Sequence, residues 1–225
     1  MKKEGVFITF EGGEGSGKTS AINFVAERMK KAGVDYLLTM EPGGTKIGEG
    51  IRKILLSPKS KGMAPETELM LYCASRSEHV RKVIKPALKD GKVVICDRFD
   101  DATIAYQGYG RGLKLDDIKK INSYVCEGLK PDLTILLDVD PVKGLKRASA
   151  RNSKDGRWNE GRFEKEKIHF HNLVREGYLK IARSEKKRIK VIDSSVDLKK
   201  LQDSVWREIE AFLIQKELLL PFKES

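Results

Sequence analysis

Five short apolar runs, rich in β-branched residues, constrain the fold of this chain more than any other feature. Each run is nearly continuous rather than alternating, which is typical of strands that are covered on both faces. Longer segments with the period of a helix separate the runs. This alternation predicts a three-layer α/β fold in which a five-stranded parallel sheet is flanked by helices. The predicted strands are Val6 to Phe10, Tyr36 to Met40, Val93 to Cys96, Leu133 to Leu137 and Ile189 to Ile192.

The segments between these runs predict helices with one apolar stripe. The stretch SKDGRWNEG, residues 153–161, differs because it is too polar and too rich in glycine for a packed element, so we predict a mobile loop there. The chain after Gln215 carries no pattern that assigns it. The predicted helices are Ser20 to Lys31, one or two helices within Pro65 to Lys89, Leu115 to Glu127, Pro141 to Asn152 and Leu198 to Leu213.

The 225 residues, 40% of them hydrophobic, can bury one substantial core, so we expect a single domain spanning 1–225. No apolar stretch approaches the roughly 20 residues that cross a bilayer, and the start of the chain has no signal-peptide pattern. We therefore expect a soluble, cytoplasmic protein with no membrane partner. Cys73, Cys96 and Cys126 lack metal-ligand spacing and lie in apolar contexts, which predicts reduced, buried thiols.

The net charge of +11 raises the question of a nucleic-acid partner. Between Lys143 and Lys190 there are 16 lysines and arginines against 6 acids, whereas the rest of the chain has 28 against 27. The excess is therefore local, and no nucleic-acid-reading motif accompanies it. A segment that closes over a polyphosphate explains the excess better than a duplex-binding surface, so we expect no nucleic-acid partner.

A glycine-rich loop, GGEGSGKTS, follows the first predicted strand and precedes the first predicted helix. Its spacing and its position are those of a P-loop. In such a loop backbone N–H groups converge on phosphate, Lys18 reaches the β- and γ-phosphate oxygens, and the Thr19 hydroxyl binds Mg²⁺. The loop therefore predicts ATP or a similar phosphoryl donor as a ligand. Its donor-binding residues are Gly12, Gly13, Glu14, Gly15, Ser16, Gly17, Lys18, Thr19 and Ser20.

A P-loop alone serves kinases, GTPase switches and motor ATPases, so other residues must decide the reaction. The second and third predicted strands are followed by MEPGGTKIGEGIRKILL and by ICDRFDDATIAYQGYGRG. Ligands bind beyond the carboxyl ends of parallel strands, which places both stretches beside the P-loop. Asp97 near Mg²⁺ and Arg98 aimed at phosphate fit this position, although the two could also form an ordinary surface ion pair.

Together these stretches identify a family. FEGGEGSGKT, EPGGT, YCASRSEHV, DRF and AYQGYGRG occur in the order found in bacterial thymidylate kinases, and the chain resembles that family over nearly its whole length. The resemblance implies a P-loop kinase fold with a short lid segment, homodimers, and transfer of the ATP γ-phosphoryl group to dTMP. No general base is required, because the attacking phosphate oxygen is already anionic at neutral pH.

The resemblance also implies roles at the acceptor phosphate and sugar. Arg52 and Arg98 would hold the phosphate of dTMP, near Asp97. Glu14 would meet the 3′ side of the deoxyribose, directly or through metal-bound water, and Tyr106 would crowd the 2′ position and disfavour ribose.

For the base, the resemblance implies that Tyr72 lies on the thymine face, that Arg76 donates to thymine O4 and that Gln107 lies by the base edge. An arginine at O4 would favour thymine, because cytosine has an amino group there. Each residue has another interpretation: Tyr72 could belong to the core, and Arg76, like Arg52, could be a solvated residue on a helix.

The lid would extend over residues 147–162. Its arginines, Arg147, Arg151, Arg157 and Arg162, could approach the transferring phosphoryl group and help to exclude water, or could form a solvated basic loop. Family members without an arginine in the P-loop take the catalytic arginine from the lid. The resemblance therefore indicates Arg151 or Arg157 as catalytic, with Arg147 binding the donor nucleotide.

Two other functions stay open on sequence alone. One is a kinase of the same architecture that phosphorylates another nucleoside monophosphate or a deoxynucleoside. The other is a P-loop ATPase that binds nucleic acid through its basic segment. The acceptor that receives the phosphoryl group would distinguish them.

Overall fold

The computed structural model describes residues 4–155 and 162–220, with side chains up to residue 150 in the first range. Within these ranges one sheet forms, with five parallel strands in the order β2-β3-β1-β4-β5. The strands are β1 (Val6–Glu11), β2 (Tyr36–Met40), β3 (Val93–Asp97), β4 (Leu133–Asp138) and β5 (Ile189–Asp193). All five were predicted. Four of them extend one residue beyond the predicted apolar run, in each case to an acidic residue at the carboxyl end.

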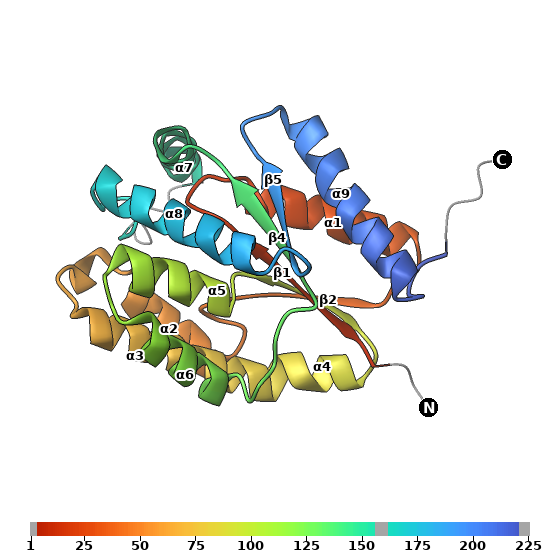
Figure 1. The fold of residues 1–225 in the computed structure, drawn as a ribbon, viewed down its shortest axis with the longest axis horizontal. Coiled ribbons are helices and arrows are strands. Elements are labelled where there is room, and N and C mark those ends of the chain that lie inside the picture. The colour runs from red at the N-terminus through yellow and green to blue at the C-terminus, as the bar shows by residue number, and fades with distance from the viewer. Residues whose placement is uncertain (1–3, 156–161, 221–225) are drawn as a thin grey trace.

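Helices cover both faces of the sheet, which completes the predicted three layers (Figure 1). Helices α1 (Lys18–Lys31) and α9 (Leu198–Gln215) pack on one face, where Ile8 and Phe10 join Met29 and Val205 in a buried core. On the other side lie α3 (Pro65–His79), α4 (Lys85–Lys89), α6 (Leu115–Val125) and α8 (Ile168–Ser184). Phe7 points to that face because successive strand residues alternate. Three buried free cysteines agree with the prediction of reduced thiols.

Besides the short 3-10 turn η1 (Pro58–Ser60), three helical segments among the described residues were not predicted from periodicity. They are α2 (Lys46–Leu56), α8, and the short α5 (Asp100–Thr103), which continues as the π-helical segment η3 (Ile104–Gly110). Gly108 and Gly110 lower the helix propensity of η3. The same glycines allow close packing, since a Cβ atom on Gly110 would collide with Phe170 of α8. Tertiary packing therefore overrides local propensity in this segment.

The boundaries of the predicted mobile loop are different in the structure. Helix α7 (Pro141–Asp155) continues three residues past the predicted end at Asn152, and the rest of that loop, 156–161, lies outside the described residues. The predicted helical stretch 65–89 divides into α3, a π-helical turn η2 (Val80–Ile84) and α4. After α9, Leu218 and Leu219 pack against the core. Within the described residues, no helix is long and apolar enough to cross a membrane.

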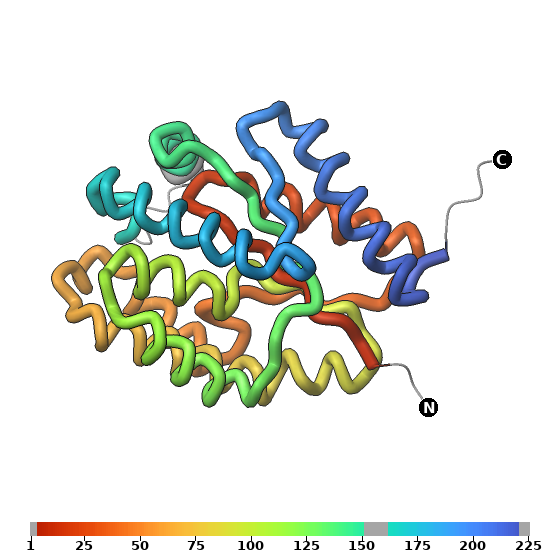
Figure 2. Tube along the Cα trace, viewed as in Figure 1, coloured from red at the N-terminus to blue at the C-terminus, as the bar shows by residue number. Residues whose placement is uncertain are grey.

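The topology concentrates loops at one edge of the sheet. Strand β1 lies between β3 and β4, and this is where the strand order changes direction, so a crevice opens beyond its carboxyl end. Helix α2 (Lys46–Leu56), which follows β2, packs on α3. Figure 2 shows the turn after β1, in red, beside the start of α7, in green, and Gly15 of that turn approaches Gly144 closely. The candidate site lies at this edge.

Candidate active site

The loop after β1 is shaped by its glycines. Gly15 has a φ of +66° and Gly17 a φ of +90°, the left-handed region that favours glycine. A Cβ atom on Gly15 would also collide with the carbonyl oxygen of Gly144 in α7. The loop therefore adopts a conformation, and a contact, that other residues do not allow. It ends at α1, whose first residue is Lys18.

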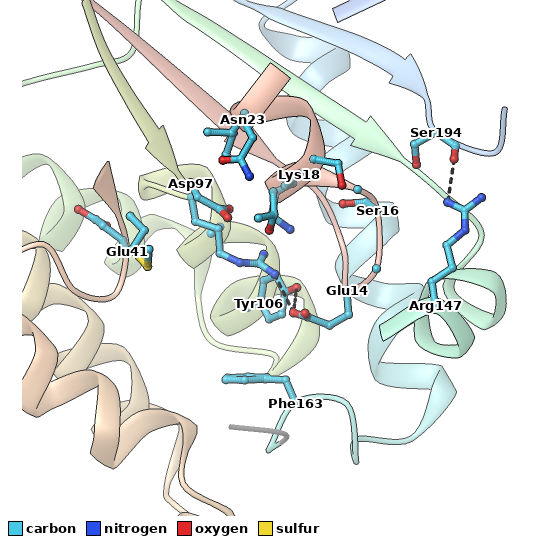
Figure 3. Close-up of a pocket in the computed structure, with 18 of the residues that line it drawn as sticks. Glu14, Ser16, Lys18, Asn23, Glu41, Asp97, Tyr106, Arg147, Phe163 and Ser194 are labelled. Carbon is cyan, nitrogen blue, oxygen red and sulfur yellow. Dashed lines mark hydrogen bonds and ion pairs between the residues drawn. The ribbon is translucent and has the colours of Figure 1, made fainter. Parts of the chain in front are cut away.

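Lys18 projects back into the loop that precedes it. Its Nζ donates to the carbonyl oxygens of Gly12 at 3.1 Å and Gly13 at 3.3 Å. Burial lowers the pKa of Lys18, and the neighbouring Arg98 lowers it further. Because α1 begins here without a side-chain cap, its first N–H groups are available to an anion. Lys18 lines the candidate site, and Figure 3 shows it between the P-loop and Asp97.

The P-loop forms one side of a cavity of about 900 Å³, large enough for nucleotide-sized ligands. The cavity extends from the loop after β5, past the P-loop, to α2, α3 and η3. Most predicted site residues whose side chains are described line it. They are Glu14, Gly15, Ser16, Gly17, Lys18, Thr19, Ser20, Arg52, Tyr72, Asp97, Arg98, Tyr106, Gln107 and Arg147. Gly12 and Gly13, at the start of the loop, line a second, smaller cavity.

Arg98 follows β3 and lies at the middle of the cavity wall. Its φ is +70°, an uncommon value for a residue other than glycine, and its backbone N–H donates to Phe10 on β1 at 2.9 Å. The guanidinium donates to Glu14 Oε1 at 2.7 Å and to the Gly12 carbonyl at 3.0 Å, and lies 4.8 Å from the centre of the Tyr106 ring. This strained backbone conformation thus directs the Arg98 guanidinium toward the P-loop, where hydrogen bonds to Gly12 and Glu14 fix its position.

Glu14 is the anionic partner of this arginine. Burial by itself would raise the pKa of Glu14, but the charges of Arg98 and Lys18 outweigh it and lower the pKa to about 2. The Tyr106 hydroxyl donates to the same carboxylate oxygen at 3.0 Å, as Figure 3 shows. Glu14 is therefore ionised at any physiological pH, and it links the P-loop to η3.

Glu11, which sequence analysis did not select, supports the turn at Arg98 from below. Its carboxyl group accepts the backbone N–H of Phe99 at 2.7 Å and the Tyr178 hydroxyl at 2.7 Å. Burial raises the pKa of Glu11 to about 8, and the neighbouring Asp101 adds to the rise. No pattern marks a single acid at a strand end as buried, and only its position under the P-loop reveals this role.

Two buried oxygens in the site fit a metal ion. Ser16 Oγ and Asp97 Oδ1 are buried, and neither has a hydrogen-bond partner among the described residues. Buried polar atoms normally have partners, so both are suited to a ligand that the cavity would receive. Thr19, an exposed residue, lines the same cavity. Hydroxyl and carboxylate oxygens are ligands that Mg²⁺ prefers.

At the other end of the cavity, Arg52, Tyr72 and Gln107 come together from α2, α3 and η3. Arg52 Nη1 donates to the Pro42 carbonyl at 3.0 Å, and Gln107 donates to a buried carboxylate, Glu68, at 2.8 Å. The aromatic ring of Phe163 also lines this end, at right angles to Tyr106 and 5.6 Å from it. Sequence analysis did not select Phe163, because a lone aromatic residue beside a polar loop carries no spacing signal.

Arg76 does not line the cavity in this structure, and its side chain is 1% exposed. Its guanidinium donates to Glu41 at 2.7 Å, to Thr103 at 2.9 Å, to Asn122 at 2.8 Å and to the Phe99 carbonyl at 2.9 Å. Glu41 and Thr103 do line the cavity, so Arg76 lies directly behind its wall. These bonds use four of the five guanidinium N–H groups.

The predicted lid arginines whose side chains are described lie in different parts of the structure. Arg147 lines the cavity near the loop after β5 and donates to the Ser194 carbonyl at 2.9 Å (Figure 3). Arg162 is buried away from the P-loop, where it donates to Glu68 and to the Leu55 carbonyl. Arg151 belongs to α7, but its side chain is not described, and Arg157 lies outside the described residues.

Comparisons with known proteins agree with this geometry. Residues 10–205 match the family model described as thymidylate kinase. The thymidylate kinase of Geotalea daltonii is 52% identical over 195 residues, which cover 86% of this chain and 91% of that protein. The thymidylate kinase of Syntrophotalea carbinolica is 48% identical over 200 residues, covering 89% and 93% of the two chains.

A solved structure extends the likeness to three dimensions. The crystal structure of thymidylate kinase from Ehrlichia chaffeensis has a TM-score of 0.71 and 35% identity, and the match covers 93% of this chain and 98% of that one. Family model, curated relatives and structure thus agree over most of the sequence, and the chain belongs to the thymidylate kinase family.

Proposed function

We propose that the chain transfers the γ-phosphoryl group of ATP to dTMP, giving ADP and dTDP. The observation that carries this proposal is one continuous cavity, with the P-loop at one end and Arg52, Tyr72 and Gln107 at the other. Arg98 lies between the two ends, where the phosphates of donor and acceptor would meet. Membership of the thymidylate kinase family supports the choice of acceptor.

At the donor end, we assign the triphosphate to the P-loop residues 12–20. Lys18 would exchange its bonds to the Gly12 and Gly13 carbonyls for phosphate oxygens, which is favourable because its ammonium group is buried and only partly solvated. Arg147 would contact the nucleoside part of ATP near Ser194, a contact that its place on the wall supports.

Mg²⁺ would be held by the Thr19 hydroxyl and Asp97, with Ser16 close by. The unpartnered oxygens of Ser16 and Asp97 support this assignment. The metal would neutralise negative charge on the phosphates, while the residues of the chain keep the two nucleotides in line.

At the acceptor end, Arg52 and Arg98 would bind the dTMP phosphate, and Tyr72 would lie against the thymine ring. Gln107 would lie by the base edge. Arg76, behind Glu41 and Thr103, retains one guanidinium N–H that could reach thymine O4 if the wall opens slightly. Tyr106 and Glu14 would meet the sugar, since their hydrogen bond lies between the base end and the P-loop.

Catalysis would depend on position and charge rather than on proton transfer. The acceptor phosphate is already an anionic nucleophile, so the site needs cations around the transferred group. Lys18 and Arg98 meet this need from the described part of the chain. One of the lid arginines, Arg151 or Arg157, would add a further cation when both nucleotides are bound.

A panel of acceptors tests the proposed reaction. The purified protein is given ATP, Mg²⁺ and one of dTMP, dCMP, AMP or thymidine, and ADP and the phosphorylated product are both measured. We expect dTMP to react with a kcat/KM at least about 100-fold above each alternative, because an unsatisfied polar group at the base edge is costly. Faster transfer to another acceptor would reject dTMP. ATP hydrolysis stimulated by DNA, without transfer to any nucleotide, would instead indicate a nucleic-acid-dependent ATPase.

We further propose that the protein acts as a homodimer in the cytoplasm, without membrane or nucleic-acid partners. Self-association is supported by exposed apolar side chains on two helices that pack together, Ile54 on α2 and Met70 on α3. Light scattering coupled to size-exclusion chromatography would measure the mass. A monomer mass at micromolar concentration would contradict the dimer and leave the reaction unaffected.

A further inference from the structure

Glu68, on α3, is fully buried beside the acceptor end of the cavity without lining it. Its carboxylate accepts hydrogen bonds from three side chains. Arg111 donates through Nε and Nη2, each at 3.1 Å, to the two carboxylate oxygens. Arg162 donates at 2.5 Å and Gln107 at 2.8 Å. One carboxylate is therefore surrounded by two guanidinium groups and an amide.

The partners of this carboxylate come from segments that line the acceptor end. Gln107 lines the cavity itself, from η3. Arg162 directly precedes Phe163, which lines the cavity in edge-to-face contact with Tyr106. The Nε of Arg162 donates to the Leu55 carbonyl at the end of α2. Leu56 is part of the same wall. The cluster thus connects α2, η3 and the chain around residue 163 through a single buried group.

The charges of the cluster explain why this group must be a carboxylate. Burial would raise the pKa of Glu68, but hydrogen bonds from Arg111 and Gln107 and the charge of Arg162 outweigh it and lower the pKa. Without the negative charge, two largely buried guanidinium groups would lose their shared counterion. Arg111 has a second partner, Glu166, at 2.7 Å, whereas no other carboxylate is described within reach of Arg162.

We propose that Glu68 is a positioning residue for the acceptor nucleotide. Its carboxylate orients the Gln107 amide and, through Arg162, holds Phe163 against the cavity. This inference rests on the acceptor end assigned under the proposed function. In the described structure no hydrogen bond or ion pair joins the P-loop to Glu68, Gln107 or Arg162, so Glu68 should affect binding of dTMP and not of ATP.

The test replaces Glu68 by glutamine, which has the same shape and no charge. Steady-state kinetics are measured with dTMP and ATP varied separately, together with the melting temperature. For Glu68→Gln we expect the KM for dTMP to rise about 10-fold or more, because the base-edge amide loses its fixed orientation, with the KM for ATP changed less than about twofold. A folded Glu68→Gln with an unchanged KM for dTMP would overturn the proposal, as would equal rises in both KM values.

Glu166→Gln is the matched control. Glu166 also pairs with Arg111, but it contacts neither Gln107 nor Arg162 in the described structure, and it is partly exposed. Its substitution should change both KM values by less than about twofold, as expected for a partly solvated pair. An effect of Glu166→Gln on the KM for dTMP equal to that of Glu68→Gln would show that loss of any partner of Arg111 is sufficient, against the proposal.

Two further variants keep the test decisive. If Glu68→Gln does not fold, Arg162→Lys decides, since lysine keeps the charge but lacks the planar fork through which Arg162 bonds Glu68 and the Leu55 carbonyl. We expect the KM for dTMP to rise about threefold, and no rise would overturn the proposal. Tyr72→Ala separates the two hypotheses. If it raises the KM for dTMP while Glu68→Gln does not, only the role of Glu68 fails. If neither variant changes it, the acceptor end itself is wrongly assigned.

Discussion

At the scale of single residues, Arg98 connects the P-loop with the end of β3 and with α8. Its left-handed backbone places the guanidinium between Glu14, the Gly12 carbonyl and the Tyr178 hydroxyl. Three acceptors in different directions match the planar fork of an arginine, and a lysine cannot satisfy them together.

We expect Arg98→Lys to lower kcat/KM for dTMP at least about 10-fold, because one ammonium group cannot hold the acceptor phosphate and Glu14 at once. Initial rates at limiting dTMP would measure this. The control is Arg183→Lys, at the exposed end of α8 and outside the cavity, which should leave the rate unchanged. Equal rates for Arg98→Lys and the wild type would remove Arg98 from the site.

Glu11 gives a prediction about pH. Its pKa is raised from 4.5 to about 8 in the folded protein, so between these values the folded state holds a proton that the unfolded state has lost. Its contribution to stability is therefore complete below pH 4.5 and is lost as the pH rises toward about 8.

Glu11→Gln removes this titration, because an amide does not ionise. The variant should still fold, because the amide can accept a hydrogen bond from the Phe99 N–H and donate one to the Tyr178 hydroxyl. The free energy of unfolding of the wild type should fall relative to that of the variant as the pH rises, by up to roughly 1.4 kcal/mol per pH unit. Urea unfolding from pH 5 to 8 would measure the difference. Parallel pH profiles for the two proteins would show that Glu11 is ionised in the native state.

Among the secondary-structure elements, α7 and the P-loop depend on each other. A Cβ atom on Gly144 would collide with the carbonyl oxygen of Glu14, as one on Gly15 would collide with Gly144. The two backbones therefore touch, and the helix that carries Arg147 lies directly against the P-loop.

Gly144→Ala should displace α7 from the P-loop and raise the KM for ATP about 10-fold, since the added methyl group meets backbone atoms that cannot yield easily. The matched control is Gly50→Ala on α2, where a Cβ atom meets nothing within 4 Å. This control should leave the KM for ATP unchanged and increase stability by about 0.5–1 kcal/mol. Kinetics with ATP varied and thermal melting would measure both effects. A Gly144→Ala protein that binds ATP normally would contradict the close contact.

At the scale of the whole molecule, each substrate should stabilise the fold separately, because the two ends of the cavity use different residues. At concentrations 100-fold above its Kd, either dTMP or ATP with Mg²⁺ should contribute about 2.7 kcal/mol, which raises the melting temperature by roughly 5–10 °C for a chain of this size. Differential scanning fluorimetry would measure both shifts, with dCMP as the comparison. A larger shift with dCMP than with dTMP would contradict the assignment of the base.

The architecture and the donor end could be predicted because their signals are local. Five apolar runs predicted five strands within one residue, and the P-loop motif predicted where phosphate would bind, since glycine and lysine spacing encodes the loop geometry directly. Resemblance to a family also selected residues that do line the acceptor end, Arg52, Tyr72 and Gln107. Their roles remain predictions, of which Tyr72→Ala tests one directly.

Other features could not be predicted, because they depend on contacts between distant segments. The sequence alone determined the parallel sheet, the phosphate loop and the reaction family, through patterns confined to short stretches. Tertiary structure alone decided that Arg76 lies behind Glu41, that Glu11 is buried under Arg98, and that η3 is helical despite its glycines. It also brought Glu68, Arg111 and Arg162 together across 94 residues of sequence. The physical reason is that burial and charge pairing arise only when the chain has folded, and neither leaves a periodic trace in the sequence.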